Sequence, residues 1–64
     1  MKYPNITVHL TGVDGNAFAI LGSVKKALRR ADVPNEEINA FMAEATAGDY
    51  DNLLATCMKW VDVQ

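Results

Sequence analysis

The sequence predicts an α+β domain in the order β-α-α-α-β, with three short helices packed on a small two-stranded sheet. Three observations support this fold class. Apolar and polar residues alternate near the amino terminus, as in a strand with one buried face. Apolar residues then recur every three or four positions, as in amphipathic helices, and β-branched residues return at the carboxyl end. With 64 residues, positions 1–64 are expected to form a single domain.

The first predicted strand covers residues 5–11. Its apolar face carries Ile6, Val8 and Leu10, and its polar face carries Thr7, His9 and Thr11. Pro4 fits just before the strand or at its start, because proline has no amide proton to donate to a ladder. A half-buried strand is therefore expected here.

A turn that contains Gly12 and Gly15 leads from this strand into the first helix. Asp14 or Asn16 can cap the helix by accepting a hydrogen bond from a first-turn amide. At about 100° per residue, the apolar residues of the helix fall within an arc of about 120°. This predicted core face consists of Ala17, Ile20, Leu21, Val24, Ala27, Leu28 and Ala31.

Residues 32–34 end the first helix, because proline disfavours a helical residue before it and suits the start of a new helix. The predicted core positions of the second helix, which closes at Gly48, are Ile38, Phe41, Met42 and Ala45. Asp49 is expected to cap the third helix. The predicted core positions of the third helix are Tyr50, Leu53, Leu54, Cys57 and Met58.

Residues 60–63 fit either an extension of the third helix or a short strand. We expect a strand, because the first strand would otherwise lack a partner for its backbone groups. Three antiparallel helices would return this strand parallel to the first, whereas an inclined helix would reverse it. The direction of the second strand therefore stays open.

The composition excludes several classes of protein. Half of the residues are hydrophobic, which is typical of a globular domain. Cys57 is the only cysteine and His9 the only histidine, so we expect no internal disulfide, no metal and no cofactor. No apolar run is long enough to span a bilayer and no leader is evident, which predicts a cytoplasmic protein without membrane contact.

The small size of the domain favours a partner chain. A domain of this length buries only about 60% of the surface that its unfolded chain exposes. The outer edges of a two-stranded sheet are also open to another chain. We therefore expect a homo-oligomer, in the first place a dimer, that joins sheet edges or packs one face of the first helix.

The best candidate for a partner-binding surface is the face of the first helix opposite its core. It consists of Phe18, Gly22, Lys25, Lys26, Arg29 and Arg30. The ordinary interpretation is a solvated charged face, with Phe18 folded back over the strand. The alternatives are an unidentified protein partner and, less favoured, nucleic acid. The net charge of −2 argues against bulk binding to nucleic acid, and four cations with one aromatic make a small footprint.

A weaker candidate is an anion site at the turn, where Gly12, Gly15 and Asn16 place free amides at a helix start. The turn lacks a phosphate-loop lysine and Asp14 would repel a phosphate, so a purely structural turn is favoured. No catalytic residues are predicted, because Cys57 lies on an apolar helix face where an inert thiol is expected. The chain is not expected to be an enzyme.

Three segments of the chain carry a family resemblance. They are residues 12–22 (GVDGNAFAILG), residues 27–31 (ALRRA), and residues 48–54 (GDYDNLL) followed by 58–61 (MKWV). In these segments the chain resembles a family of very small, functionally uncharacterised proteins of bacteria and their phages. The family is expected to have glycine where this chain has Asp32. The resemblance implies no activity, cofactor or site residue.

The functional expectation is a small non-enzymatic accessory protein that dimerises and binds another macromolecule. The alternative is a nucleic-acid-binding regulator that uses the basic face of the first helix.

Overall fold

A computed structural model describes residues 1–10, 12 and 14–64. The elements in chain order are β1 (Tyr3–Val8), α1 (Ala17–Arg30), α2 (Asn35–Ala45), α3 (Tyr50–Trp60) and β2 (Val61–Val63). This confirms the predicted α+β fold and its β-α-α-α-β order. Thr11 and Val13, which belong to the predicted strand and turn, lie outside the described residues.

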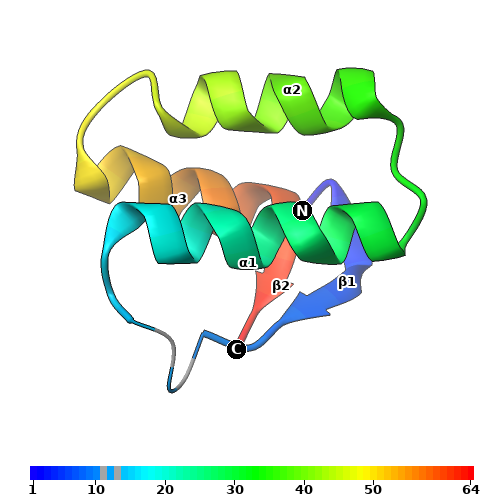
Figure 1. The fold of residues 1–64 in the computed structure, drawn as a ribbon, viewed down its shortest axis with the longest axis horizontal. Helices are drawn as coiled ribbons and strands as arrows, with labels where there is room; N and C mark the ends of the chain where they lie inside the picture. The colour runs from blue at the N-terminus through cyan, green and yellow to red at the C-terminus, as the bar shows by residue number, and fades with distance from the viewer. Residues whose placement is uncertain (11, 13) are drawn as a thin grey trace.

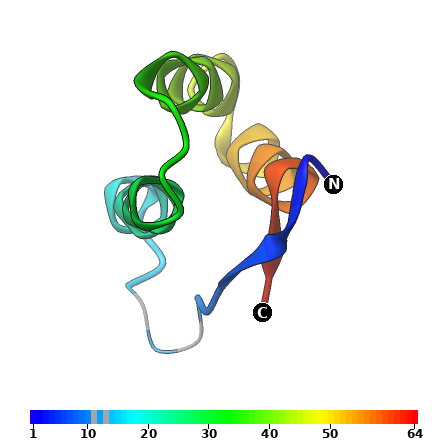
Figure 2. The ribbon, with the colours of Figure 1, turned by 90° about the vertical axis from the view of Figure 1, so that its right-hand side faces the viewer.

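The three helices form a bundle that packs against the two strands (Figure 1). Figure 2 looks nearly along the helices and shows α2 above α1 and α3, with the strands below. The core therefore lies where the inner faces of the helices meet the upper face of the sheet. Its largest fully buried side chains are Phe41, Leu28, Val24, Val61 and Cys57.

The two strands are parallel, which answers the question of direction that the sequence leaves open. Val8 pairs with Val63, and the register is irregular between Tyr3 and Thr7. The predicted strand boundaries are wrong, because β1 begins at Tyr3 and ends at Val8. Pro4 lies inside β1, in this irregular part of the strand. Because the regular pairing is interrupted there, the amide proton that proline lacks is not needed for a hydrogen bond between the strands.

The predicted alternation in β1 is confirmed where the structure describes it. Ile6 and Val8 are buried and Leu10 is partly buried, whereas Thr7 and His9 are exposed.

Side chains cap two of the helices. Asn16 Oδ1 accepts a hydrogen bond from Ala19 N at 2.8 Å, and Asp14 Oδ1 accepts one from Asn16 N at 3.2 Å. Asn16 is therefore the cap of α1, and Asp14 supports it. Asp49 Oδ1 accepts a hydrogen bond from Asn52 N at 2.9 Å and caps α3 as predicted.

The core faces of α1 and α2 are largely as predicted. Ile20, Leu21, Val24 and Leu28 are buried in α1, and Ile38, Phe41 and Ala45 are buried in α2. Met42 is only partly buried, and Ala31 is exposed just beyond the end of α1. Gly48 does not end α2, because the helix already stops at Ala45 with Thr46 as its cap.

The predicted core face of α3 is partly wrong. Tyr50 and Met58 are exposed, whereas Thr56 and Trp60 are buried. The reason is that Trp60 belongs to the last turn of α3 and not to the strand. A helix face that contains Leu53, Cys57 and Trp60 at positions i, i+4 and i+7 turns Met58 outward.

Candidate interaction surfaces

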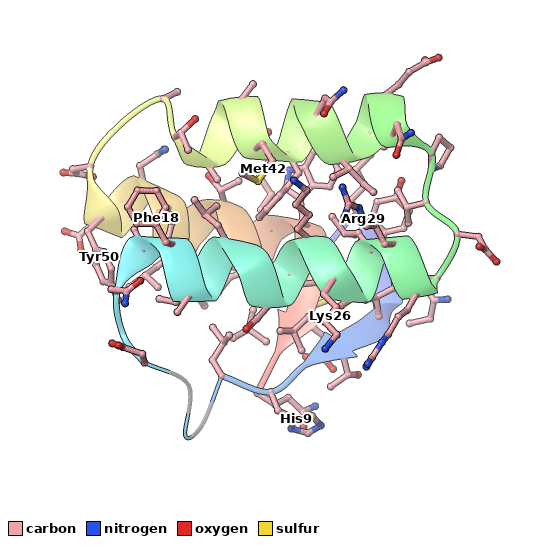
Figure 3. The ribbon with its side chains drawn as sticks, viewed as in Figure 1. His9, Phe18, Lys26, Arg29, Met42 and Tyr50 are labelled. Atoms are coloured by element: carbon pink, nitrogen blue, oxygen red, sulfur yellow. The ribbon has the colours of Figure 1, made fainter. Side chains whose placement is uncertain are left out.

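The six residues predicted to bind a partner lie on two different sides of α1. Phe18, Gly22, Lys25 and Arg29 follow one another at spacings of three and four along the side next to α2, and we call them the Phe18 stripe. Lys26 and Arg30 lie on the other side, facing β1. Figure 3 shows Phe18 and Arg29 above the axis of α1 and Lys26 below it.

Phe18 is the most exposed large apolar side chain of the described residues, with 88% of its surface in solvent. The interpretation that Phe18 folds back over the strand is therefore wrong. Met42 points from α2 toward α1 (Figure 3). It is partly buried against the core, and its exposed part adds a flexible apolar side chain near the stripe.

Gly22 leaves an open space beside Phe18. A Cβ atom built on Gly22 would meet no atom within 4 Å outside the local backbone of α1. Glycine inside a helix costs about 0.5–1 kcal/mol relative to alanine. No packing constraint in the described part of the chain requires this glycine, so its small size has no explanation within the single subunit.

A groove separates the other side of α1 from β1, and we call it the basic groove. Its volume is about 420 Å³, within the range of ligand sites in proteins. The residues that line it include Asn5, Ile6 and His9 of the first strand and its end, and Lys26, Ala27 and Arg30 of α1. Lys26 and Arg30 are one helical turn apart and both are exposed. Among the described residues, no acidic side chain lines the groove.

One amide of the glycine turn is already occupied within the chain. Asn16 N donates a hydrogen bond to Asp14 Oδ1 at 3.2 Å, which places a carboxylate where an anion would have to bind. The carbonyl of Gly15 accepts a hydrogen bond from the Tyr50 hydroxyl, which ties the turn to α3. Gly12 has a φ of +84°, a conformation that favours glycine whatever the turn binds. These contacts favour the structural interpretation of Gly12, Gly15 and Asn16 over an anion site.

Cys57 faces the core of the domain from α3, with 1% of its surface exposed. Burial raises the pKa of its thiol, which disfavours the reactive thiolate. His9 lies at the edge of the basic groove and is exposed. Over residues 1–10, 12 and 14–64, no group of three His, Cys, Asp or Glu side chains is placed to hold a metal ion.

Two carboxylates on α2, Glu37 and Glu44, form polar contacts with distant parts of the chain that no local sequence pattern predicts. Glu37 Oε1 lies 2.8 Å from Lys2 Nζ and accepts a hydrogen bond from the Tyr3 hydroxyl at 3.0 Å. These two hydrogen bonds lower the pKa of Glu37. The Lys2 ammonium also lies 4.2 Å from the centroid of the Trp60 ring. The network holds the start of β1 against α2 and α3, which is a structural role.

No protein-family model, curated protein or solved structure matches this chain. The family resemblance of the glycine turn and its neighbouring segments therefore stays a hypothesis. In the part of the chain that the structure describes, no helix combines the length and the apolar character needed to cross a bilayer.

Proposed function

We propose that this chain is a non-enzymatic interaction protein that forms a homodimer through the Phe18 stripe and binds another macromolecule. The observation that carries the proposal is the pairing of a fully exposed phenylalanine with an uncovered glycine one turn away on the same helix. An exposed aromatic side chain beside a position without a side chain allows another chain to pack closely, and buried aromatic side chains are typical anchors of interfaces.

A second copy of the chain fits this surface by symmetry. If two α1 helices pack antiparallel about a twofold axis that passes midway between Phe18 and Gly22 on the exposed side, Phe18 of each copy lies over Gly22 of the other. The antiparallel arrangement also opposes the two helix dipoles, which is favourable. The shape of the exposed side and the helix dipoles therefore both support self-association.

The apolar contact sets the expected strength of the dimer. Burying one phenylalanine side chain contributes about 1.5–3 kcal/mol, and the dimer buries two. Association costs at least about 4 kcal/mol in lost freedom of motion. The two buried side chains together contribute about 3–6 kcal/mol, which is close to this cost, so the phenylalanines alone give at most a weak dimer and the other contacts of the stripe must supply the rest of the binding free energy.

Sedimentation equilibrium over a dilution series from about 1 μM to about 1 mM tests this proposal. We expect a concentration-dependent dimer that Phe18→Asp abolishes. Met58→Asp is the matched control, because Met58 is 63% exposed on α3 and lies outside the stripe. A strict monomer at the highest concentration, or equal weakening by both variants, would overturn the proposed dimer.

Binding of nucleic acid is the second candidate function, and four cations within six residues of α1 favour it. It ranks lower because these cations divide between the two sides of the helix. Fluorescence anisotropy with a labelled oligonucleotide at low salt tests it. Binding that weakens steeply with salt and is lost in the Lys26→Glu, Arg29→Glu double variant would support this function. Salt-insensitive binding, or none, would remove it.

A further inference from the structure

The basic groove lies where a third strand of the sheet would run. In Figure 1, α1 passes in front of the upper part of both strands, and its carboxyl-terminal end reaches beyond β1 on the side away from β2. The 14 residues of α1 span about 21 Å, whereas neighbouring strands are only about 4.8 Å apart. The helix is therefore long enough to cover more strands than the sheet contains.

The side of α1 that faces this space includes a row of small residues beside Lys26 and Arg30. Ser23, Ala27 and Ala31 succeed one another at intervals of four residues and all line the groove. Ala31, which follows the last residue of α1, is exposed. Small side chains leave room for a backbone between the helix and the edge of β1.

The backbone of β1 faces the groove with unpaired groups. Val8 O accepts a hydrogen bond from Gln64 N, and Leu10 N donates one to Gln64 O, both at 2.8 Å. These residues therefore direct their backbone groups toward β2. Because successive residues of a strand alternate in direction, Thr7 and His9 direct theirs toward the groove. Within the described residues β1 pairs with β2 alone, so this edge is free.

The positive charge of the basic groove favours an acidic ligand. Lys26 and Arg30 stand along one wall, and none of the described lining residues is acidic. An added strand would place every second side chain on the α1 side of the sheet, within reach of these cations. Carboxylate side chains at those positions would complement the groove.

We propose that the basic groove binds an extended acidic segment of another protein, which adds to the free edge of β1 as a third strand. This inference rests on the proposed interaction function and names the chemical class of the partner. Backbone hydrogen bonds to the strand edge supply affinity, and carboxylates on Lys26 and Arg30 supply selectivity.

Charge and hydrogen-bonding pattern argue against two other occupants. A second copy joined through β1 would bring the Lys26 and Arg30 side chains of both subunits together across the symmetry axis, which is repulsive. A nucleic acid would satisfy the cations. Its phosphates offer no donors for the carbonyl groups of the strand edge, however, whereas a peptide backbone matches both donors and acceptors.

The experiment titrates the full chain with three fluorescein-labelled peptides and follows their anisotropy. The first peptide alternates Glu and Val, the second alternates Lys and Val, and the third is the Glu-Val peptide with methylated backbone nitrogens. We expect binding of the first peptide alone, because the second has the wrong charge and the third cannot donate to the strand edge. The amide signals of Thr7 and His9 should shift on binding.

Two charge-matched double variants locate the binding site. Lys26→Glu with Arg30→Glu should weaken binding of the Glu-Val peptide at least about tenfold, because it reverses the wall of the groove. Lys25→Glu with Arg29→Glu changes the net charge by the same amount in the Phe18 stripe, outside the groove, and should weaken binding of the peptide much less than the groove variant, whatever its effect on the proposed dimer. Circular dichroism checks that both variants fold.

Four outcomes would overturn the inference. They are absence of binding, equal binding of the methylated peptide, equal weakening by both double variants, and stronger binding of a labelled oligonucleotide at the same sites. None of them bears on the Phe18 dimer, which sedimentation of the Phe18→Asp variant tests separately. Failure of the proposed dimer likewise leaves the peptide titration interpretable.

Discussion

The indole Nε1 of Trp60 donates a hydrogen bond to Oε1 of Glu44 at 3.3 Å and ties the end of α3 to the end of α2. Glu44 Oε2 lies 2.9 Å from Lys59 Nζ. The Trp60 ring packs edge-on against Phe41, with centroids 5.6 Å apart. One acidic residue of α2 therefore orients an aromatic side chain of the core.

The two carboxylates of α2 predict how stability depends on acid. Hydrogen bonds from Lys59 and Trp60 lower the pKa of Glu44, as those from Lys2 and Tyr3 lower the pKa of Glu37. Both carboxyls are thus more acidic in the folded chain than their ordinary value of 4.5. Their contribution to stability is present above that pH and is lost as the pH falls through the folded pKa values. We expect the thermal midpoint to fall between about pH 6 and about pH 3.

The Glu37→Gln, Glu44→Gln double variant separates these two carboxyls from the rest of the chain. It should be less stable than the parent near pH 6 and should lose less stability on acidification, as followed by circular dichroism. Glu36→Gln is the control, because Glu36 is an exposed neighbour on the same helix. An acid profile of the double variant that matches the parent would contradict the assignment.

Asp32 is expected to be replaceable by glycine with a gain in stability. It follows the end of α1 with a φ of +59°, the left-handed conformation that favours glycine. Asp32 N donates to Arg29 O and Val33 N to Leu28 O, both at 3.0 Å, which is the Schellman pattern of a helix end. Relief of strain of about 1–2 kcal/mol is partly offset by about 0.4–1 kcal/mol of added freedom in the unfolded chain. Asp32→Gly should therefore stabilise by up to about 1 kcal/mol.

Urea unfolding of three variants checks the role of the backbone at position 32. Asp32→Gly should raise the midpoint, Asp32→Asn should leave it nearly unchanged, and Asp32→Ala should lower it, because alanine tolerates the left-handed region least. A midpoint that rises equally with glycine and alanine would show that the aspartate charge, and not the conformation, matters.

Local sequence patterns predicted most of the fold, and the predictions that were wrong have identifiable physical causes. The core face of α1 follows from its own spacing because four strongly apolar residues define it. The core face of α3 could not be predicted in the same way, because Trp60 fits a helix and a strand equally well. The strand begins only at Val61, which pairs with Tyr3 of β1, and this contact between distant residues is not signalled by any local pattern.

The sequence predicted which residues of α1 lie away from its core, but not that they divide between two separate surfaces. Helical spacing places Lys25 and Lys26 at different angles, yet it cannot say that β1 lies on one side and α2 on the other. The basic groove depends on how far α1 extends past β1, which is a property of tertiary packing. The network of Glu37 and Glu44 joins residues as distant as Lys2 and Glu37, a pairing that no local pattern signals.

Cys57 is expected to be unreactive until the domain opens. Its thiol is buried and its pKa is raised, so a disulfide reagent can attack only after local or global unfolding. Under native conditions the reaction should be at least about 100-fold slower than in urea. The control is Met58→Cys in a Cys57→Ala background, which exposes a thiol at the neighbouring position and should react at once. Equal native rates for the two proteins would contradict the burial of Cys57.

Gly22→Ala is expected to stabilise the single subunit and to weaken the proposed dimer. The added methyl group meets no atom within 4 Å beyond the helix's own backbone, so the gain in helix propensity of about 0.5–1 kcal/mol should appear in urea unfolding at low protein concentration. In the dimer the same methyl group fills the space beside Phe18, and sedimentation should show weaker association. Gly48→Ala is the control, because its Cβ would lie 3.0 Å from Cβ of Asn52, so it should destabilise the subunit. If Gly22→Ala raised stability and left association unchanged, the space beside Phe18 would not be the contact that joins two copies.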